Sequence, residues 1–145
     1  MKYNKPLYAV LIGMAIAFIF EAYTQIAKLL GLTPLSIFET NSSLFMAEPS
    51  WIIGLLTTPL TGALVGFVIY QMTRYVGEDY LYLKSALFSM FTWAAVQIMI
   101  SFAGQSDMVH SVSGNVVMAM GAALVGALAG YLISKFLLSK TDSIK

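Results

Sequence analysis

Residues 7–30 read LYAVLIGMAIAFIFEAYTQIAKLL, a run of 24 residues whose only charged side chains are Glu21 and Lys28. A helix rises about 1.5 Å per residue, so this run is about 36 Å long and can cross a hydrocarbon core of about 30 Å with some tilt. Glu21 lies about two-thirds of the way along it. A carboxylate at that depth is costly unless it meets water, a partner or a proton, so we expect Glu21 to face the interior of a helix bundle.

The composition of the chain is that of an integral membrane protein. Of its 145 residues, 59% are hydrophobic and only 10% are charged, and the mean hydropathy is +0.80. A soluble domain has about 25% charged residues. The net charge of +1 and the lack of a basic stripe argue against a nucleic-acid partner. The chain has no cysteine, which excludes disulfides, thiolate metal sites and thiol catalysis.

Three further apolar segments predict an all-α fold, a polytopic membrane protein with four transmembrane helices in a bundle. We expect a single transmembrane domain over residues 1–145. An interfacial loop over residues 31–50 connects its first two spans on the outer side. The expected spans cover approximately residues 7–30, 51–75, 83–103 and 113–135. In the loop, Ser36 and Glu39 have capping-box spacing, so a short helix is expected to start there. The loop is either a lid or a surface loop packed on the helix ends.

The distribution of lysine and arginine predicts the orientation. Four spans place both termini on one side of the membrane, and that side carries seven of the eight basic residues, whereas the other carries only Lys28. Basic residues concentrate on the cytoplasmic side of membrane proteins. We therefore expect both termini in the cytoplasm, in a multi-pass protein of the cell membrane (an inner or plasma membrane).

Polar side chains from three spans are expected at a similar depth. Glu21, Gln25 and Lys28 share one face of the first span. Thr58 in the second span and Gln97 in the third lie at about the depth of Glu21 when residues are counted from the span ends. We therefore expect a ligand-binding site of Glu21, Gln25, Thr58 and Gln97 in a polar cavity that is open to the outside. In the competing interpretation Glu21 pairs with Lys28 or Gln97, and the network only fixes helix packing.

Glycines spaced four apart line one face of two spans. Gly62 and Gly66 lie in the second span, and Gly126 and Gly130 in the fourth. Small residues let helix backbones approach closely in lipid, so we expect these four glycines to be helix-packing residues. The second and fourth spans are then expected to make the closest helix contacts. The glycine faces pack either within one subunit or between subunits.

The chain also contains an internal repeat. Ala-Leu-Val-Gly at residues 63–66 recurs at residues 123–126, which is an offset of 60. Gln-Ile at residues 25–26 recurs at residues 97–98. Two helical hairpins related by an axis along the membrane normal would give this pattern.

No motif for catalysis or metal binding is found in the sequence. His110 is the only histidine, which excludes paired haem ligation or a histidine-based zinc site within one chain. The sequence has no H-E-x-x-H, no P-loop and no Ser/His/Asp arrangement. We therefore expect a protein that is not an enzyme and that has no metal and no cofactor.

The third span, LKSALFSMFTWAAVQIMISF at residues 83–102, comes between a long outer loop and a Gly/Ala-rich fourth span. This layout, with Met99-Ile100-Ser101-Phe102, resembles small uncharacterised four-span bacterial inner-membrane proteins of the YagU/YqhR type. The resemblance implies a bacterial inner-membrane address. It implies no activity, and no functional residue follows from it.

Two classes of function fit the sequence. The first is a transport- or channel-like role for a small ion, proton or polar solute, in an oligomer because four short helices hardly enclose a pathway alone. The second is a non-catalytic membrane subunit or scaffold that packs through its Gly/Ala faces against partner membrane proteins. Its partners are then the lipid bilayer and either copies of itself or another membrane protein. The first class requires Glu21 to be wet, and the second requires it to be paired and dry.

Overall fold

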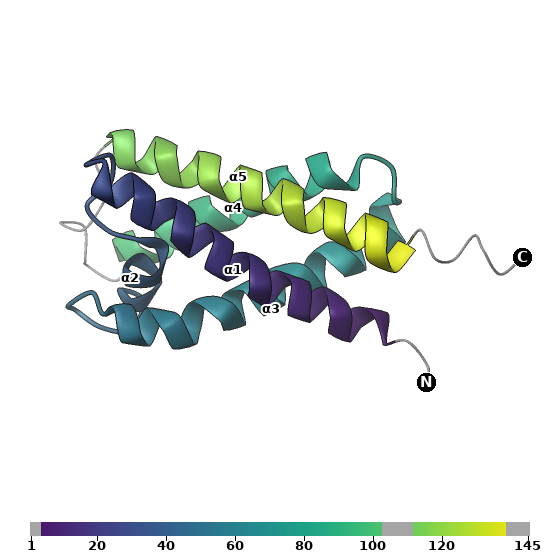
Figure 1. Cartoon of the computed structure of the whole chain (residues 1–145), viewed down its shortest axis with the longest axis horizontal. Helices are drawn as coiled ribbons and strands as arrows, with labels where there is room; N and C mark the ends of the chain where they lie inside the picture. Colours follow the sequence, from purple (N-terminus) through teal and green to yellow (C-terminus); the bar gives the residue numbers. More distant parts are fainter. Residues whose placement is uncertain (1–3, 103–111, 139–145) are drawn as a thin grey trace, which may run out of the picture.

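The computed structural model describes residues 4–102 and 112–138, and within these ranges the protein is helical, without strands. A short helix, α2, and four long helices make up the described fold (Figure 1). The long helices are the expected four spans packed together. The elements are α1 (Lys5–Leu29), α2 (Ile37–Ser42), α3 (Trp51–Val76), α4 (Leu81–Phe102) and α5 (Val112–Ile133), which continues as a π-helical turn, η2 (Ser134–Leu138).

Each long helix has the length and surface of a membrane span. The shortest has 22 residues, about 33 Å at the helical rise, and the longest apolar segment, Val112–Leu138, has 27. Large apolar side chains point outward as well as inward. Leu56, Leu60 and Leu64, for example, are 64%, 63% and 67% exposed on α3. In water such a surface would be unstable, whereas in a bilayer it faces lipid chains.

The helices pair as two close hairpins, α1 with α3 and α4 with α5. In the first pair, Gly62 and Gly66 of α3 lie against the backbone of Gly13 in α1. In the second pair, Gly126 of α5 lies against the Ser85 carbonyl in α4. A Cβ atom added at any of these α3 or α5 glycines would lie closer than 3.0 Å to backbone of the neighbouring helix. The glycines are therefore what lets these helix pairs touch.

The contacts between α3 and α5 correct one expectation. These two helices share few contacts, and their glycines face α1 and α4 instead of each other. The expectation that the second and fourth spans make the closest contacts is therefore wrong. A small-residue stripe marks a face of close approach, but it does not name the helix that approaches.

The glycine contacts of the two hairpins correspond to one another. Gly62 lies against the Gly13 carbonyl and the Ala17 side chain. In the same way, Gly126 lies against the Ser85 carbonyl and the Ser89 side chain. Adding 72 to the residue numbers of α1 gives the corresponding residues of α4, and adding 64 to those of α3 gives the corresponding residues of α5. By the same shift, Gly66 corresponds to Gly130. The shift of 72 is the offset of the repeated Gln-Ile. The shift of 64 differs by one helical turn from the offset of 60 in the repeated Ala-Leu-Val-Gly.

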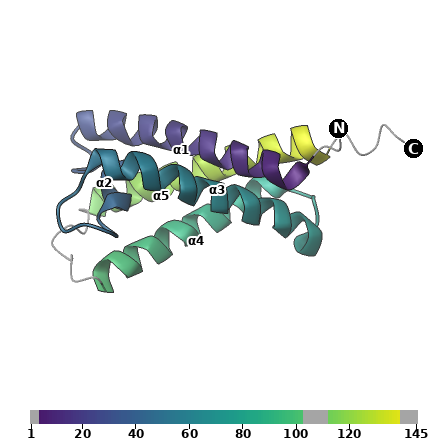
Figure 2. The ribbon, with the colours of Figure 1, turned by 90° about the horizontal axis from the view of Figure 1, so that it is seen from below.

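The two hairpins meet mainly through α1 and α5, whereas α3 and α4 share few contacts. Figure 2 shows α4 diverging from α3 toward the end of the bundle that carries α2. On the α1–α5 side, Gly121 lies against the rings of Phe20 and Tyr23, and the Tyr23 hydroxyl donates to the Val117 carbonyl at 3.1 Å. One side of the bundle is thus closely packed, and the other is looser.

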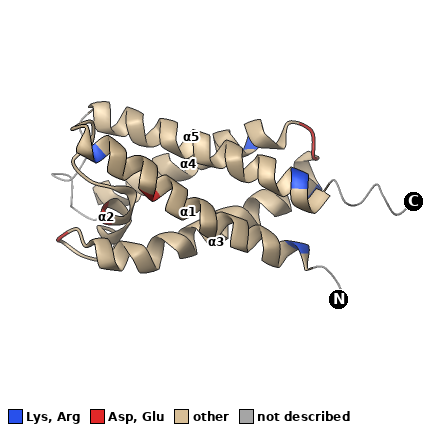
Figure 3. Cartoon of the chain, in the orientation of Figure 1, with Lys and Arg blue, Asp and Glu red and all other residues tan. Residues whose placement is uncertain are grey.

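Basic side chains gather at one end of the bundle. Lys5 begins α1, Arg74 lies in the last turn of α3, Lys84 in the first turn of α4 and Lys135 in η2, whereas Lys28 lies in the last turn of α1. Figure 3 shows the Lys and Arg colour mainly toward one end of the bundle. Lys84 closes the turn between α3 and α4 by donating to the carbonyl of Val76 at 2.7 Å. This arrangement agrees with the distribution of Lys and Arg along the sequence, from which the orientation is predicted.

Candidate functional site

The α2 helix starts where the capping box predicts it. The Ser36 hydroxyl accepts from the backbone N–H of Glu39 at 3.4 Å, and the Glu39 carboxylate accepts from the backbone N–H of Ser36 at 2.8 Å. Four of the six helical residues are nearly inaccessible or fully so: Ile37, Phe38, Thr40 and Ser42 are at most 3% exposed. The segment is therefore packed into the end of the bundle.

Glu21 is buried, and its carboxylate accepts three hydrogen bonds. Its side chain is 6% exposed. Oε1 accepts from Gln25 Nε2 at 2.6 Å and from Trp51 Nε1 at 2.8 Å. Oε2 accepts from the backbone N–H of Phe38 at 2.9 Å. These donors come from α1, α3 and α2, so this one carboxylate joins three elements.

Lys28 pairs with a carboxylate other than Glu21. Its ammonium donates to both oxygens of Glu39, each at 2.7 Å. The pairing of Glu21 with Lys28, which belonged to the competing interpretation, is therefore not formed. The reason is that α2 brings its own carboxylate up to Lys28 and presents a backbone N–H to Glu21.

The ion pair changes the titration of Glu39. Partial burial raises the pKa of this carboxyl, but the hydrogen bonds from Lys28 and from the Ser36 backbone, together with the charge of Lys28, outweigh it and hold the pKa below its ordinary value. Glu39 is therefore ionised at neutral pH and tied to α1.

Further hydrogen bonds hold α2 between α1 and α3. The Thr24 hydroxyl of α1 accepts from the backbone N–H of Ile37 at 3.0 Å. On the other side, Asn41 Nδ2 donates to the Thr58 hydroxyl of α3 at 3.1 Å. The backbone of Phe38 also lies directly against Gly54, where an added Cβ would clash with it. These contacts dock α2 firmly on two of the spans.

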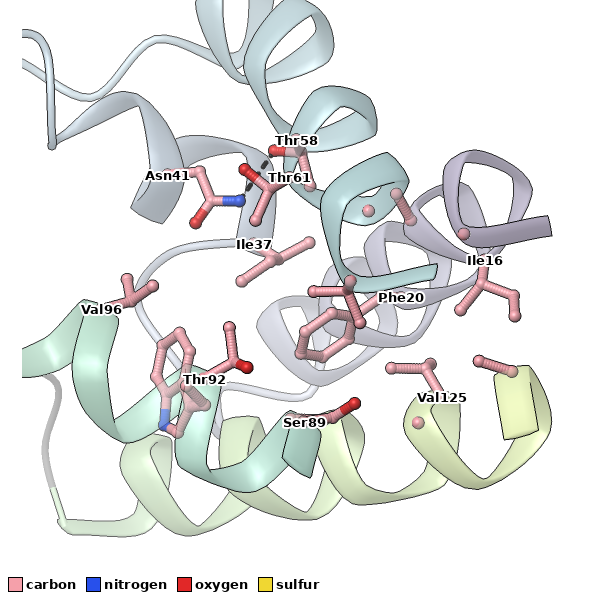
Figure 4. Close-up of a pocket in the computed structure, with 18 residues that line it drawn as sticks. Ile16, Phe20, Ile37, Asn41, Thr58, Thr61, Ser89, Thr92, Val96 and Val125 are labelled. Carbon is pink, nitrogen blue, oxygen red and sulfur yellow. Dashed lines mark hydrogen bonds between the residues drawn. The ribbon is translucent and has the colours of Figure 1, made fainter. Parts of the chain in front are cut away.

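A cavity of about 90 Å³ lies between the two hairpins. Its walls come from all four spanning helices and from α2, and they are mostly small or apolar. Figure 4 shows Asn41, Thr58 and Thr61 on one wall and Ser89 and Thr92 on the wall opposite. The lining residues are Gly13, Ile16, Ala17, Phe20, Ile37, Asn41, Thr58, Thr61, Gly62, Val65, Ser89, Thr92, Trp93, Val96, Ala122, Val125, Gly126 and Ala129.

Only one of the four expected ligand-binding residues lines this cavity. Thr58 lies in its wall, whereas Glu21 and Gln25 bond to each other and are not among the residues that line it. Gln97 borders a separate hollow formed with Ile98 and neighbouring residues at the end of α4, and its Nε2 has no partner within residues 4–102 and 112–138. The hydrogen bond between Glu21 and Gln97, the other option of the competing interpretation, is therefore not formed. Gln97 lies on a helix that packs against α5 instead of α1.

The hydroxyl groups around the cavity differ in how they are satisfied. Thr61 and Thr92 donate to carbonyls one turn earlier in their own helices, at 3.2 and 3.0 Å. Thr58 accepts from Asn41. Ser89 Oγ, by contrast, is buried and has no hydrogen-bond partner among the described residues. It is the polar atom in the wall that protein groups leave unsatisfied.

Sequence reasoning missed several residues of this region. Neither Trp51, which donates to Glu21, nor Asn41, which donates to Thr58, was among the predicted site residues. Ser89 carried no signal, because a serine in a span is common and its neighbours depend on the fold. The one local signal for α2 was its capping box, which predicted a short helix in this loop. Packed into the bundle, that helix brings the backbone N–H groups of Ile37 and Phe38 to Thr24 and Glu21 of α1.

No group of three metal-ligating side chains occurs among the described residues, and His110 lies outside them. No family model, curated protein or solved structure matches the chain. The resemblance to YagU/YqhR-type proteins therefore stays an expectation. The function has to be argued from the geometry of the bundle.

Proposed function

We propose that this integral membrane protein binds a small, uncharged and largely apolar molecule in the cavity between its two hairpins. This role belongs to the transport-like class of the two that fit the sequence. The proposed substrate differs from the expected ion, proton or polar solute, because it is a molecule that dissolves in the bilayer. One observation carries the proposal, namely a cavity whose walls come from every spanning helix and from α2. Ligand sites in helix bundles lie between helices and are mainly apolar with a few polar groups.

The chemistry of the walls supports an apolar ligand. No Lys, Arg, Asp, Glu or His belongs to the described residues that line the cavity. An ion would lose its hydration there without gaining a counter-charge, which is strongly unfavourable. An apolar molecule would lose no hydrogen bonds on entry, and it would replace the empty space by van der Waals contacts.

The looseness between α3 and α4 supports a route of entry from the membrane. These two helices border the cavity, yet they share few contacts with each other. A molecule dissolved in the bilayer could pass between them without crossing the outer loop. The other side of the bundle, where α1 meets α5, is closely packed by Tyr23 and Phe20 against Gly121.

The buried carboxylate does not support ion or proton transport. Glu21 is enclosed by three donors and lies outside the cavity lining. A group that binds and releases a cation needs access to water, whereas this one accepts hydrogen bonds from three elements. We propose that its role is to anchor α2.

A scaffold role, the alternative, has less support within the described chain. In the scaffold hypothesis the Gly/Ala faces contact partner proteins. The four glycines instead contact helices of the same chain: Gly62, Gly66, Gly126 and Gly130. A partner helix inserted between α3 and α4 would be another way to fill the cavity. Oligomerisation, the cytoplasmic termini, the inner or plasma membrane as location and the lack of enzymatic activity remain proposals.

The proposal is tested with the two tryptophans, of which Trp93 lines the cavity. A Trp51→Phe variant loses one of the three donors to Glu21 and keeps the other two, so its circular dichroism is first matched to that of the unmutated protein. When it is reconstituted with lipids that carry brominated chains, we expect quenching of Trp93, although this side chain is only 7% exposed. Thr61→Phe, on the opposite wall, should fill the cavity and abolish most of the quenching while circular dichroism and melting temperature stay near those of the parent. Quenching that is absent, or that survives Thr61→Phe unchanged, would overturn the proposal.

A further inference from the structure

Ser89 is a buried hydroxyl that the fold leaves without a partner. Its side chain is 7% exposed, its Oγ has no hydrogen bond within the part of the chain that the structure describes, and it lines the cavity. Buried polar groups in folded proteins nearly always have a partner, and each exception calls for an explanation. A ligand in the cavity would supply the hydrogen bond that this hydroxyl lacks.

The threonine hydroxyls around the cavity are satisfied, unlike Ser89, whose side chain also lies against Gly126 of α5. Thr92, less than one turn later on α4, donates to its own helix at 3.0 Å, and Thr61 on the facing wall does so at 3.2 Å. Ser85 Oγ is also unpartnered, but it is fully buried between α4 and α5 and does not line the cavity. A second polar group, the amide of Asn41 bonded to Thr58, lies on the wall across from Ser89 (Figure 4).

We infer that the ligand has an apolar body and one uncharged oxygen, a hydroxyl or a carbonyl, that accepts a hydrogen bond from Ser89 Oγ. This inference rests on the proposed function and narrows its ligand class. The apolar body matches the Gly, Ala, Ile and Val surfaces of the cavity, and the oxygen matches the unpartnered Ser89 hydroxyl in its wall. A charged head group does not fit, because none of the described lining residues carries a charge.

The test compares three brominated probes of equal chain length, an alkane, an alcohol and the methyl ether of that alcohol. Each is added to the Trp51→Phe protein in bilayers, and the quenching of Trp93 is measured against the mole fraction of the probe. The alcohol and the ether both offer an acceptor oxygen, so both should quench at a lower mole fraction than the alkane. We expect a preference of about three- to tenfold, the size of one net hydrogen bond.

Variants assign the preference to Ser89. Ser89→Ala should remove it, bringing alcohol and ether to the level of the alkane, while quenching by the alkane stays unchanged. Ser101→Ala is the matched control, because this exposed serine on the same helix donates to the Gln97 carbonyl at 2.9 Å. It should leave the preference intact.

The outcomes separate the two proposals. If all three probes quench equally in the parent protein, or if Ser89→Ala keeps the preference, the assignment of the polar group is overturned and the apolar site stands. If no probe quenches Trp93, the proposed function fails as well. Because the ether and alkane are compared on the unmutated Ser89, a folding defect in the variant does not decide the result.

Discussion

The backbone N–H of Phe38 donates to Glu21 Oε2 at 2.9 Å, across a separation of 17 residues. The bond joins the first turn of α2 to a carboxylate inside the first span. It explains why an acidic side chain is tolerated at this depth, since the other carboxylate oxygen accepts from Gln25 and Trp51 and the charge is thus met by three donors. The structural consequence is that α2 is held against the bundle by a buried group.

Replacing Glu21 by glutamine should destabilise the protein, although the two side chains have nearly the same shape. Both oxygens of Glu21 accept, so in either orientation of the amide its NH₂ group would face a donor, either Phe38 N–H or the side chains of Gln25 and Trp51. Leaving buried donors unpaired costs about 1–3 kcal/mol. We expect Glu21→Gln to lower the free energy of unfolding by about that amount, as measured by thermal or denaturant unfolding in one detergent.

The matched control is Glu48→Gln, which makes the same chemical change at an exposed position in the loop after α2. Its melting temperature should stay close to that of the parent. Equal melting of Glu21→Gln and Glu48→Gln would show that the three hydrogen bonds do not anchor α2.

Lys28 should couple to Glu39 and not to Glu21. Lys28 Nζ lies 2.7 Å from both oxygens of Glu39. In double-mutant cycles with Lys28→Met, Glu39→Gln should give a clear coupling free energy, whereas Glu21→Gln should give nearly additive effects. The reverse result would restore the pairing of Glu21 with Lys28 that the sequence offered as the competing interpretation.

The same pair should make stability depend on pH in the acidic range. The pKa of Glu39 is lower in the folded protein than its ordinary value of 4.5, so its contribution is complete above that value and is lost as the pH falls through the folded pKa. We expect the melting temperature of the parent to approach that of Glu39→Gln as the pH is lowered below about 4.5. A difference between the two proteins that stays constant with pH would contradict the assignment.

The spans and the start of α2 could be predicted because both depend on local sequence. Apolar length is enough to identify a membrane helix, and Ser36 with Glu39 satisfies the first N–H groups of α2 within four residues. The partners of Glu21 could not be predicted in the same way. Trp51 is 30 residues away, and the donor at Phe38 is a backbone group, which no residue type marks.

The structure does not bring the four expected site residues together, and the reason is geometric. Depth along a span can be counted from the sequence, but the direction in which a side chain points depends on which helices are neighbours. Gln97 lies on α4, which packs against α5, so a depth similar to that of Glu21 does not bring the two together. The glycine stripes have the same ambiguity, since the spacing of Gly62 and Gly66 defines a face but not the helix α1 that covers it.

Alanine substitutions should rank the glycines by what their missing side chain touches. At Gly62 an added Cβ would lie 2.5 Å from the carbonyl oxygen of Gly13, which is backbone and cannot rotate away. At Gly121 it would meet the rings of Tyr23 and Phe20, which can shift. We expect Gly62→Ala to lower the melting temperature much more than Gly121→Ala, even though alanine favours a helix by about 1 kcal/mol at both positions. The opposite order would show that α1 and α3 do not touch at Gly62.

Single-cysteine labelling can test the orientation, because the chain has no cysteine of its own. Ala47, after α2, and Asp79, in the turn between α3 and α4, are both exposed and lie at opposite ends of the bundle, whereas Ser43 is only 1% exposed and is unsuitable. Among the described residues, Lys28 is the only basic one at the α2 end. Basic residues favour the cytoplasmic side, so an impermeant maleimide added to intact cells should label Ala47→Cys alone. Asp79→Cys should react only after permeabilisation, and its labelling in intact cells, with Ala47→Cys protected, would reverse the orientation.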